Sequence, residues 1–248
     1  MRNFNRLVLN EWLKITKKRS YIVPYLMVLV FALAVGYITH TFTTDMFASA
    51  ADFTAEMLLP TGVGQIMAIL VITGTAGIVS REYSQGTIKF LLIRARSRTA
   101  ILASKYVTVL LYTLSLLLAA GAAVFISGGI FFGLSGGKAG IAGILTSLLY
   151  CTIYCTVYAT IGFMLGILTK STGITIGATI FATTIDKMII SREFYKYVLF
   201  PNLNLAAYRD GGAPMQGMTL SFSVTLLCVY MAVFLFAGFA VFRRRDVA

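Results

Sequence analysis

The chain has little charge. Only 12% of its 248 residues are Asp, Glu, Lys or Arg, and 58% are hydrophobic. Soluble domains average about 25% charged residues. The sequence is therefore not that of an ordinary soluble domain, and its long uncharged runs place it among membrane proteins.

The groups that enzymes commonly use are scarce. His40 is the one histidine, and the three cysteines, Cys151, Cys155 and Cys228, fall inside apolar runs. Cys151 and Cys155 have no His or further Cys nearby, so we expect neither a disulfide framework nor a metal site. The stretch Gly136–Ala139 lacks both the earlier glycine and the Ser or Thr of a phosphate-binding loop. We expect no catalytic site and no cofactor bound by this chain.

Six apolar runs predict an all-α integral membrane protein, a single domain spanning residues 1–248. A crossing takes about 20 residues. None of the six contains Asp, Glu, Lys, Arg or His, which argues against a proton-driven carrier because such carriers place ionisable groups in the membrane. The runs are Tyr21–Thr39, Thr61–Ser80, Tyr106–Leu134, Ile141–Leu168, Gly173–Ile185 and Met218–Phe242.

Residues 1–19 precede the six-span bundle of residues 20–248 and predict a basic amphipathic helix. One face gathers apolar residues at helical spacing and the other gathers polar and basic ones, as in helices that lie in the membrane interface. A solvated basic tail is the alternative. The apolar face consists of Phe4, Leu7, Val8, Trp12 and Ile15, and the polar face of Arg6, Asn10, Lys14 and Lys17.

The basic residues predict the topology. Of the 21 Lys and Arg residues, sixteen lie in the N-terminal segment, the stretch 81–105, the turn 169–172 and the C-terminus, and five lie in the other connections. Lys and Arg accumulate on the cytoplasmic side of membrane proteins. We therefore expect both termini and residues 81–105 in the cytoplasm, and residues 186–217 outside. The net charge of +12 is thus explained without a nucleic-acid partner.

The stretch 81–105 is basic, with Glu82 as its one acid, and its apolar middle, Ile88–Ile93, is too short to cross a membrane. It therefore lies along the membrane face or docks onto another protein. Gly86 permits a sharp turn and Thr87 can cap a helix that begins at Ile88. Apolar side chains there, including Phe90 and Leu91, can fill a groove. The alternative is an interfacial helix held by anionic lipid.

Two patterns inside the spans suggest close contacts. The pairs Gly162/Gly166 and Gly173/Gly177 remove side chains from one helix face, so neighbouring backbones can approach; the alternative is the general abundance of glycine in membrane helices. Tyr150, Tyr154 and Tyr158 recur every four residues on one face. They predict either the wall of a polar pathway or subunit interface, or ordinary hydrogen bonding between helices.

The stretch 81–105 resembles the cytoplasmic motif of type 2 ATP-binding cassette exporter permeases: an acid, Gly-Thr, a Leu pair, Pro-x-Ser-Arg, then Lys. Ala95 replaces the proline, which leaves the local bend less rigid. The amphipathic N-terminus, the six spans, the segment 186–217 and the ending Arg245-Asp246 extend the resemblance over the whole chain. The matching residues are Glu82, Gly86, Thr87, Leu91, Leu92, Ser97, Arg98 and Lys105.

The resemblance implies a plasma-membrane permease subunit that is not itself an enzyme. Two copies, as a homodimer, would work with two copies of a separate ATPase subunit that holds ATP and Mg²⁺. Residues 81–105 would form the coupling helix on that ATPase, using Glu82, Tyr83, Gly86, Thr87, Phe90, Leu91 and Arg98.

General similarity to bacitracin, lantibiotic and phenol-soluble modulin exporters suggests that amphipathic or hydrophobic peptides are moved out of the cell. Two alternatives remain. One is an exporter of sodium, drugs or lipids with the same architecture, and the other is a membrane immunity or sensor protein that transports nothing.

Overall fold

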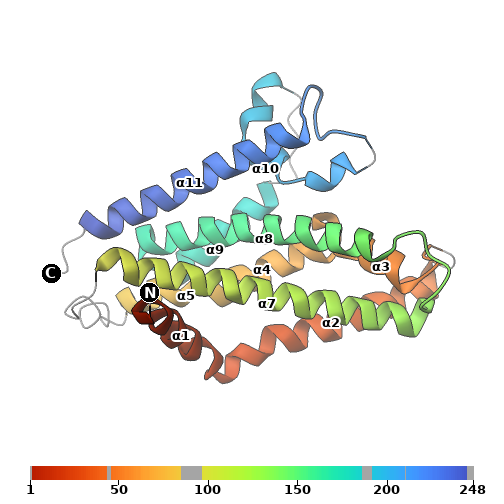
Figure 1. Ribbon diagram of the computed structural model, residues 1–248, viewed down its shortest axis with the longest axis horizontal. Helices are drawn as coiled ribbons and strands as arrows, with labels where there is room; N and C mark the ends of the chain where they lie inside the picture. Colours follow the sequence, from red (N-terminus) through yellow and green to blue (C-terminus); the bar gives the residue numbers. More distant parts are fainter. Residues whose placement is uncertain (1, 44–45, 85–96, 186–191, 210, 245–248) are drawn as a thin grey trace.

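Every regular element in the described part of the chain is a helix (Figure 1). The computed structural model describes residues 2–43, 46–84, 97–185, 192–209 and 211–244. The longer helices are α1 (Arg2–Thr16), α2 (Ile22–Phe42), α4 (Gln65–Thr75), α7 (Arg98–Phe132), α8 (Ile141–Thr169), α9 (Thr172–Ile185) and α11 (Leu220–Arg244). The short ones are η1 (Arg19–Tyr21), α3 (Ala50–Met57), η2 (Pro60–Gly64), α5 (Gly77–Ser84), η3 (Glu193–Tyr197), α10 (Leu199–Asn202) and η4 (Leu205–Tyr208).

Helix α7 is the centre of the bundle. Ser97 caps its first turn by accepting a hydrogen bond from the N–H of Ala100 at 3.3 Å. The helix ends at Phe132, and the next residue, Gly133, has a φ of 79°, where a side chain is disfavoured. Along its 35 residues α7 contacts α1, α2, α3, α4, α5, α8 and α11. Its middle supplies fully buried side chains, among them Leu116 and Leu117.

Five helical segments are long and apolar enough to cross a membrane, counting only the described residues. The chain is therefore a multi-pass membrane protein. Helix α9, in the fifth expected span, has 14 residues. At 1.5 Å per residue it is about 21 Å long, which is short of a hydrocarbon core of about 30 Å. The five segments that are long enough, which do not include α9, are Arg19–Phe42, Pro60–Glu82, Arg98–Phe132, Ile141–Thr169 and Leu220–Arg244.

The helix of the third expected span begins earlier than the span. Helix α7 starts at Arg98, before Tyr106, so the last part of the stretch 81–105 forms its first two turns. The cause is local: Ser97 supplies a cap, and Ile101 and Leu102 are already buried at 4% and 0% exposure.

The two ends of the bundle carry different elements (Figure 1). Helix α1, the last turn of α5, the first turn of α7 and the last turn of α11 gather at one end, which we call the α1 end. There the Arg98 guanidinium donates a hydrogen bond to the carbonyl of Arg243 at 3.2 Å, joining α7 to α11. Helix α3 and the α7–α8 connection lie at the opposite end, which we call the α3 end.

Backbone donors hold the α3 end together. The Asp52 carboxylate of α3 accepts hydrogen bonds from the N–H groups of Lys138 at 3.0 Å and Ala139 at 2.7 Å. Ser49 caps α3 by accepting from the N–H of Asp52 at 3.2 Å. A side chain at Gly137 would overlap the Ser49 hydroxyl, so glycine is required there. These bonds tie the α7–α8 connection to α3.

The segment 186–217 is anchored to α11 over its described part. Asn202 donates to the carbonyls of Lys196 at 2.9 Å and Val198 at 2.7 Å, and its own carbonyl oxygen accepts from Ser223 at 2.7 Å. Ser223 also shares a 2.8 Å hydrogen bond with Tyr208. One buried amide therefore organises the short helices of this segment against α11.

Candidate functional site

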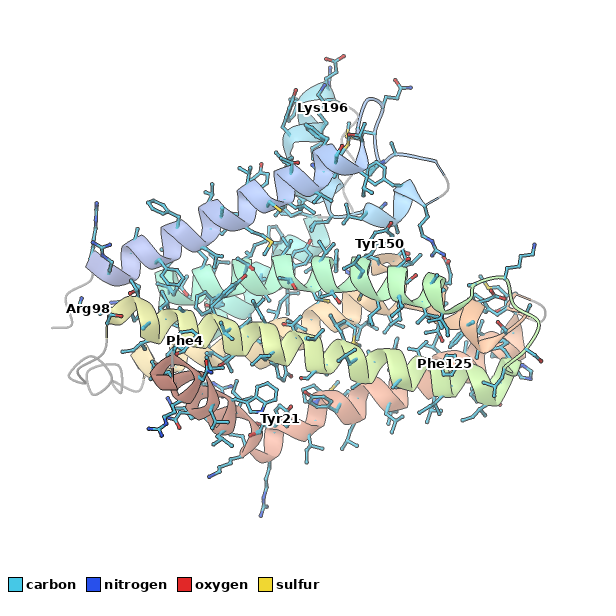
Figure 2. The ribbon with its side chains drawn as sticks, in the orientation of Figure 1. Phe4, Tyr21, Arg98, Phe125, Tyr150 and Lys196 are labelled. Atoms are coloured by element: carbon cyan, nitrogen blue, oxygen red, sulfur yellow. The ribbon has the colours of Figure 1, made fainter. Side chains whose placement is uncertain are left out.

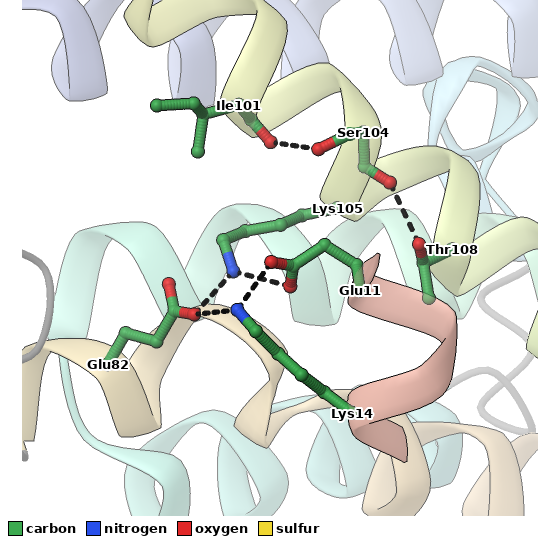
Figure 3. Close-up of polar contacts among 7 residues, drawn as sticks. All are labelled: Glu11, Lys14, Glu82, Ile101, Ser104, Lys105 and Thr108. Carbon is green, nitrogen blue, oxygen red and sulfur yellow. Dashed lines mark hydrogen bonds and ion pairs between the residues drawn. The ribbon is translucent and has the colours of Figure 1, made fainter. Parts of the chain in front are cut away.

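Four charged side chains from three helices meet at the α1 end (Figure 3). Lys105 of α7 lies 2.7 Å from a Glu11 oxygen of α1 and 2.7 Å from a Glu82 oxygen of α5. Lys14 lies 2.6 Å from Glu11 and 3.3 Å from Glu82. We call these residues the ion-pair cluster. Since they come from α1, α5 and α7, the cluster fixes those helices to one another.

Because the cluster is largely buried, breaking its ion pairs would destabilise the protein. The Lys105 side chain is 0% exposed, and those of Glu11 and Glu82 are 11% and 14% exposed. A charge removed from water must be paired, because an uncompensated buried charge costs several kcal/mol, about 3–5 when one partner is deleted. Lys14 is half-exposed and contributes less.

The sequence places Glu11 on the buried face of α1. Glu11 is one helical turn from both Leu7 and Ile15, which are half-buried, and Ile15 packs against the core. On α7, the Ser104 hydroxyl donates to the Ile101 carbonyl at 2.8 Å, so it is satisfied within its own helix. Lys105 instead pairs with Glu11 of α1 and Glu82 of α5.

The charges alter the acid–base behaviour of α1. Burial raises the pKa of Glu11, but attraction and hydrogen bonds from Lys105 and Lys14 outweigh it, so the pKa lies below the ordinary 4.5. Burial lowers the pKa of Lys14, but Glu11 and Glu82 outweigh it, so that pKa lies above the ordinary 10.5. Both groups are therefore charged at neutral pH.

The expected coupling residues are divided by the structure. Glu82 belongs to the ion-pair cluster, and Arg98 bonds to the end of α11. Tyr83 lies in α5, and its side chain is outside the described residues. The remaining four, Gly86, Thr87, Phe90 and Leu91, also lie outside the described residues.

The tyrosines of α8 do not share one environment. Tyr154 and Tyr158 are 2% and 0% exposed, with ring centroids 5.0 Å apart, so they lie inside a single copy of the chain. Tyr150 is half-buried (Figure 2). Their role in a pathway stays a prediction.

The two glycine pairs differ in what they face. A side chain at Gly162 would begin 3.6 Å from the Thr179 hydroxyl of α9, and one at Gly166 would begin 3.5 Å from the Ala76 carbonyl. At Gly173 and Gly177 a side chain would meet nothing within 4 Å among the described residues. The first pair therefore lies at a contact of α8 with its neighbours, and the second lies on the open face of α9.

Sequence reasoning missed Glu11 and the role of Lys105. A signal existed for Glu11, which is a lone acid on the face formed by Leu7, Val8, Trp12 and Ile15. No such signal exists for Lys105, because its position just before an apolar run is equally compatible with an exposed and with a buried side chain.

The fold defines a helical multi-pass membrane protein. The family model described as "Protein of unknown function (DUF2705)" matches residues 16–248, and the chain belongs to this family. The "Uncharacterized protein YhcI" of Bacillus subtilis (strain 168) is 33% identical over 234 residues, covering 86% of this chain and 70% of that protein. The "Uncharacterized membrane protein YdbK" of the same strain is 26% identical over 192 residues, covering 73% and 78% respectively.

Proposed function

We propose that the chain is the permease subunit of an ATP-driven exporter of the type 2 ATP-binding cassette class. It crosses the cell membrane six times, with α9 as the core of the fifth crossing, and both termini are cytoplasmic. Two copies form a homodimer and work with two copies of a separate ATPase subunit. That subunit binds ATP and Mg²⁺ and hydrolyses the ATP.

The contact between Glu82 and Lys105 carries this proposal. These are the first and last residues that match the exporter motif, and their side chains lie 2.7 Å apart. The two ends of the motif are therefore in contact, and Glu11 of the amphipathic helix α1 pairs with Lys105 at this contact. An ATPase that moves the segment between α5 and α7 would move α1, α5 and α7 together. In this arrangement Glu82 supports the coupling segment from within the chain.

The proposed substrate is an amphipathic or strongly apolar peptide, moved from the cytoplasm or inner leaflet outward. The five segments long enough to span a membrane contain one charged side chain away from their ends, that of Lys105. The other charged or His residues of these segments lie near the ends: Arg19, His40, Arg81, Glu82, Arg98, Arg243 and Arg244. The five segments therefore offer few counter-charges to a small ion. Half-buried hydroxyl and aromatic groups on α8, such as Tyr150 and Thr152, suit a ligand with one apolar and one polar face.

The test of the class is reconstitution. The chain is purified from native membranes, and a co-purifying subunit with a phosphate-binding loop is identified and reconstituted with it in lipid nanodiscs. We expect Gly86→Leu to abolish stimulation of the ATPase while the chain still inserts. Gly140→Leu is the control, because a side chain there meets nothing within 4 Å among the described residues. Purification without any ATPase would contradict the proposal and favour an immunity or sensor protein. Full stimulation in Gly86→Leu would instead mean that the ATPase docks elsewhere on the chain.

The substrate is tested in the same nanodiscs. Amphipathic helical peptides should change the ATPase rate at concentrations where scrambled peptides of equal charge do not. A response only to sodium, lipid or a small planar drug would refute the peptide assignment and leave the permease assignment standing.

A further inference from the structure

A cavity of about 710 Å³ lies between α1, η1 and α2 on one side and α4 and α5 on the other. Its lining changes along the bundle. Lys14, Lys18 and Arg81 lie toward the α1 end, whereas Met27 and Leu70 lie further along α2 and α4. Arg81 and Leu70 are eleven residues apart on nearly continuous helices, which corresponds to about 16 Å. The cavity therefore has a charged end and an apolar end.

The charged end favours an anion. Among its described lining residues are three cations, Lys14, Lys18 and Arg81, and two acids, Glu11 and Glu82. Lys105, which does not line the cavity, lies 2.7 Å from both acids, and Lys14 also lies 2.6 Å from Glu11 and 3.3 Å from Glu82, so two cations pair with the two acids. The basic groups at this end therefore outnumber the acids by two. A phosphate group suits such a site, because Lys binds it as a point charge and Arg as a planar fork.

The apolar end opens to the side of the bundle. Val23 and Met27 line the cavity and remain 49% and 55% exposed. They continue onto an apolar face of α2 where Ile22, Leu26 and Val30 are also exposed. In a multi-pass membrane protein such a face meets the hydrocarbon, so a ligand that enters here comes from the bilayer.

The back wall is held in place. Tyr25 shares hydrogen bonds with Tyr21 at 2.8 Å and with Ser115 of α7 at 2.7 Å. A side chain at Gly74 would overlap the Tyr112 ring, so this glycine lets α4 and α7 approach behind the cavity. Trp12 packs edge-on against Tyr21 at 6.1 Å. These contacts give the cavity a defined shape.

We infer that this cavity binds one phospholipid with an anionic headgroup. The phosphate lies among Lys14, Lys18 and Arg81, and an acyl chain runs past Met27 and Leu70. A soluble phosphate compound would leave the apolar end unused, and a cationic peptide would face like charge. The site would bind lipid whether or not the chain transports anything, so it can fail or hold independently of the proposed function.

The test is native mass spectrometry of the full chain purified in detergent, titrated with phosphatidylglycerol and phosphatidylcholine of identical acyl chains. We expect one tightly bound phosphatidylglycerol and a clear preference for it. Each Lys or Arg near an anionic lipid surface contributes about fivefold in affinity. The variant Lys18→Gln/Arg81→Gln should therefore bind phosphatidylglycerol about 25-fold more weakly, with phosphatidylcholine unchanged.

A matched control removes the same charge nearby. Lys17 and Arg19 are exposed and do not line the cavity, so Lys17→Gln/Arg19→Gln should keep the wild-type affinity. Met27→Trp narrows the apolar end with all charges in place and should also weaken binding. Equal affinity for the two lipids, equal loss in both double variants, displacement by millimolar inorganic phosphate, or preferential binding of an anionic or amphipathic peptide would each overturn the inference.

Discussion

At the residue scale, Lys105 holds the α1 end together, because it is fully buried and touches acids from two other helices. We expect Lys105→Met to lower the free energy of unfolding by about 3 kcal/mol, because Glu11 and Glu82 lose their buried partner and keep only the half-exposed Lys14. The measurement is thermal or denaturant unfolding in detergent. Lys17→Met removes an exposed charge just after the end of α1 and should change little. Equal losses in the two variants would contradict the role given to Lys105.

The same cluster predicts how stability depends on pH. The pKa of Glu11 is lowered, so its contribution is present above 4.5 and is lost as the pH falls through the folded-state pKa. The pKa of Lys14 is raised, so its contribution is present below 10.5 and is lost as the pH rises through the folded-state pKa. Unfolding curves between pH 3 and pH 8 should show an acid loss that is smaller in Glu11→Gln. An unchanged acid loss in that variant would contradict the assignment.

The residues of this cluster also show how far sequence reasoning reaches. Glu11 could have been found, because its helical spacing places it among apolar residues. The pairing of Lys105 with Glu82 could not, since 22 residues separate them and nothing local brings them together. Lys105 is buried because α1 and α5 cover its face of α7 and each supplies an acid there. This packing of three helices depends on the tertiary structure and not on local sequence.

At the scale of elements, the contact between α8 and α9 depends on Gly162. A side chain there would begin 3.6 Å from Thr179, so alanine fits and leucine does not. We expect Gly162→Leu to destabilise the chain by about 1–3 kcal/mol, the usual cost of overpacking, and Gly162→Ala to be tolerated. Gly177→Leu is the control, because it faces open space among the described residues. The measurement is the unfolding midpoint in detergent, and an equal loss at Gly177 would contradict this contact as the cause.

Apolar runs predicted the positions of the helices well and their ends less well. Uncharged length alone located α2, α8 and α11. The start of α7 was missed because its first turns carry Arg98 and Lys105, charges that an apolar-run criterion excludes. In the structure Arg98 bonds to the carbonyl of Arg243, and Lys105 pairs with Glu11 and Glu82. Helix α9 covers the whole of the expected fifth span, Gly173–Ile185, but this apolar run is itself shorter than the roughly 20 residues that a crossing takes.

At the scale of the whole molecule, the arrangement of the ends constrains topology. Helix α1 and the last turn of α11 lie at the same end of the bundle (Figure 1), as do the two helices that flank residues 85–96. The side of the membrane that this end faces therefore decides whether a cytoplasmic ATPase can reach the motif. The cysteine usage of the chain makes this measurable, because Cys151 and Cys155 are buried and only Cys228 of the three is exposed.

In a Cys228→Ser background, we expect Ser135→Cys to react with a membrane-impermeant maleimide in intact cells and Lys17→Cys to react only after permeabilisation. Ser135 is exposed at the α3 end and Lys17 at the α1 end, so neither label depends on opening the fold. Ser49, although it lies at the α3 end, is a poor probe because it is 1% exposed and caps α3. The charge distribution motivates this orientation. Labelling of Lys17→Cys in intact cells would place the coupling motif outside the cell, where no cytoplasmic ATPase could engage it, and would refute the permease proposal at its root.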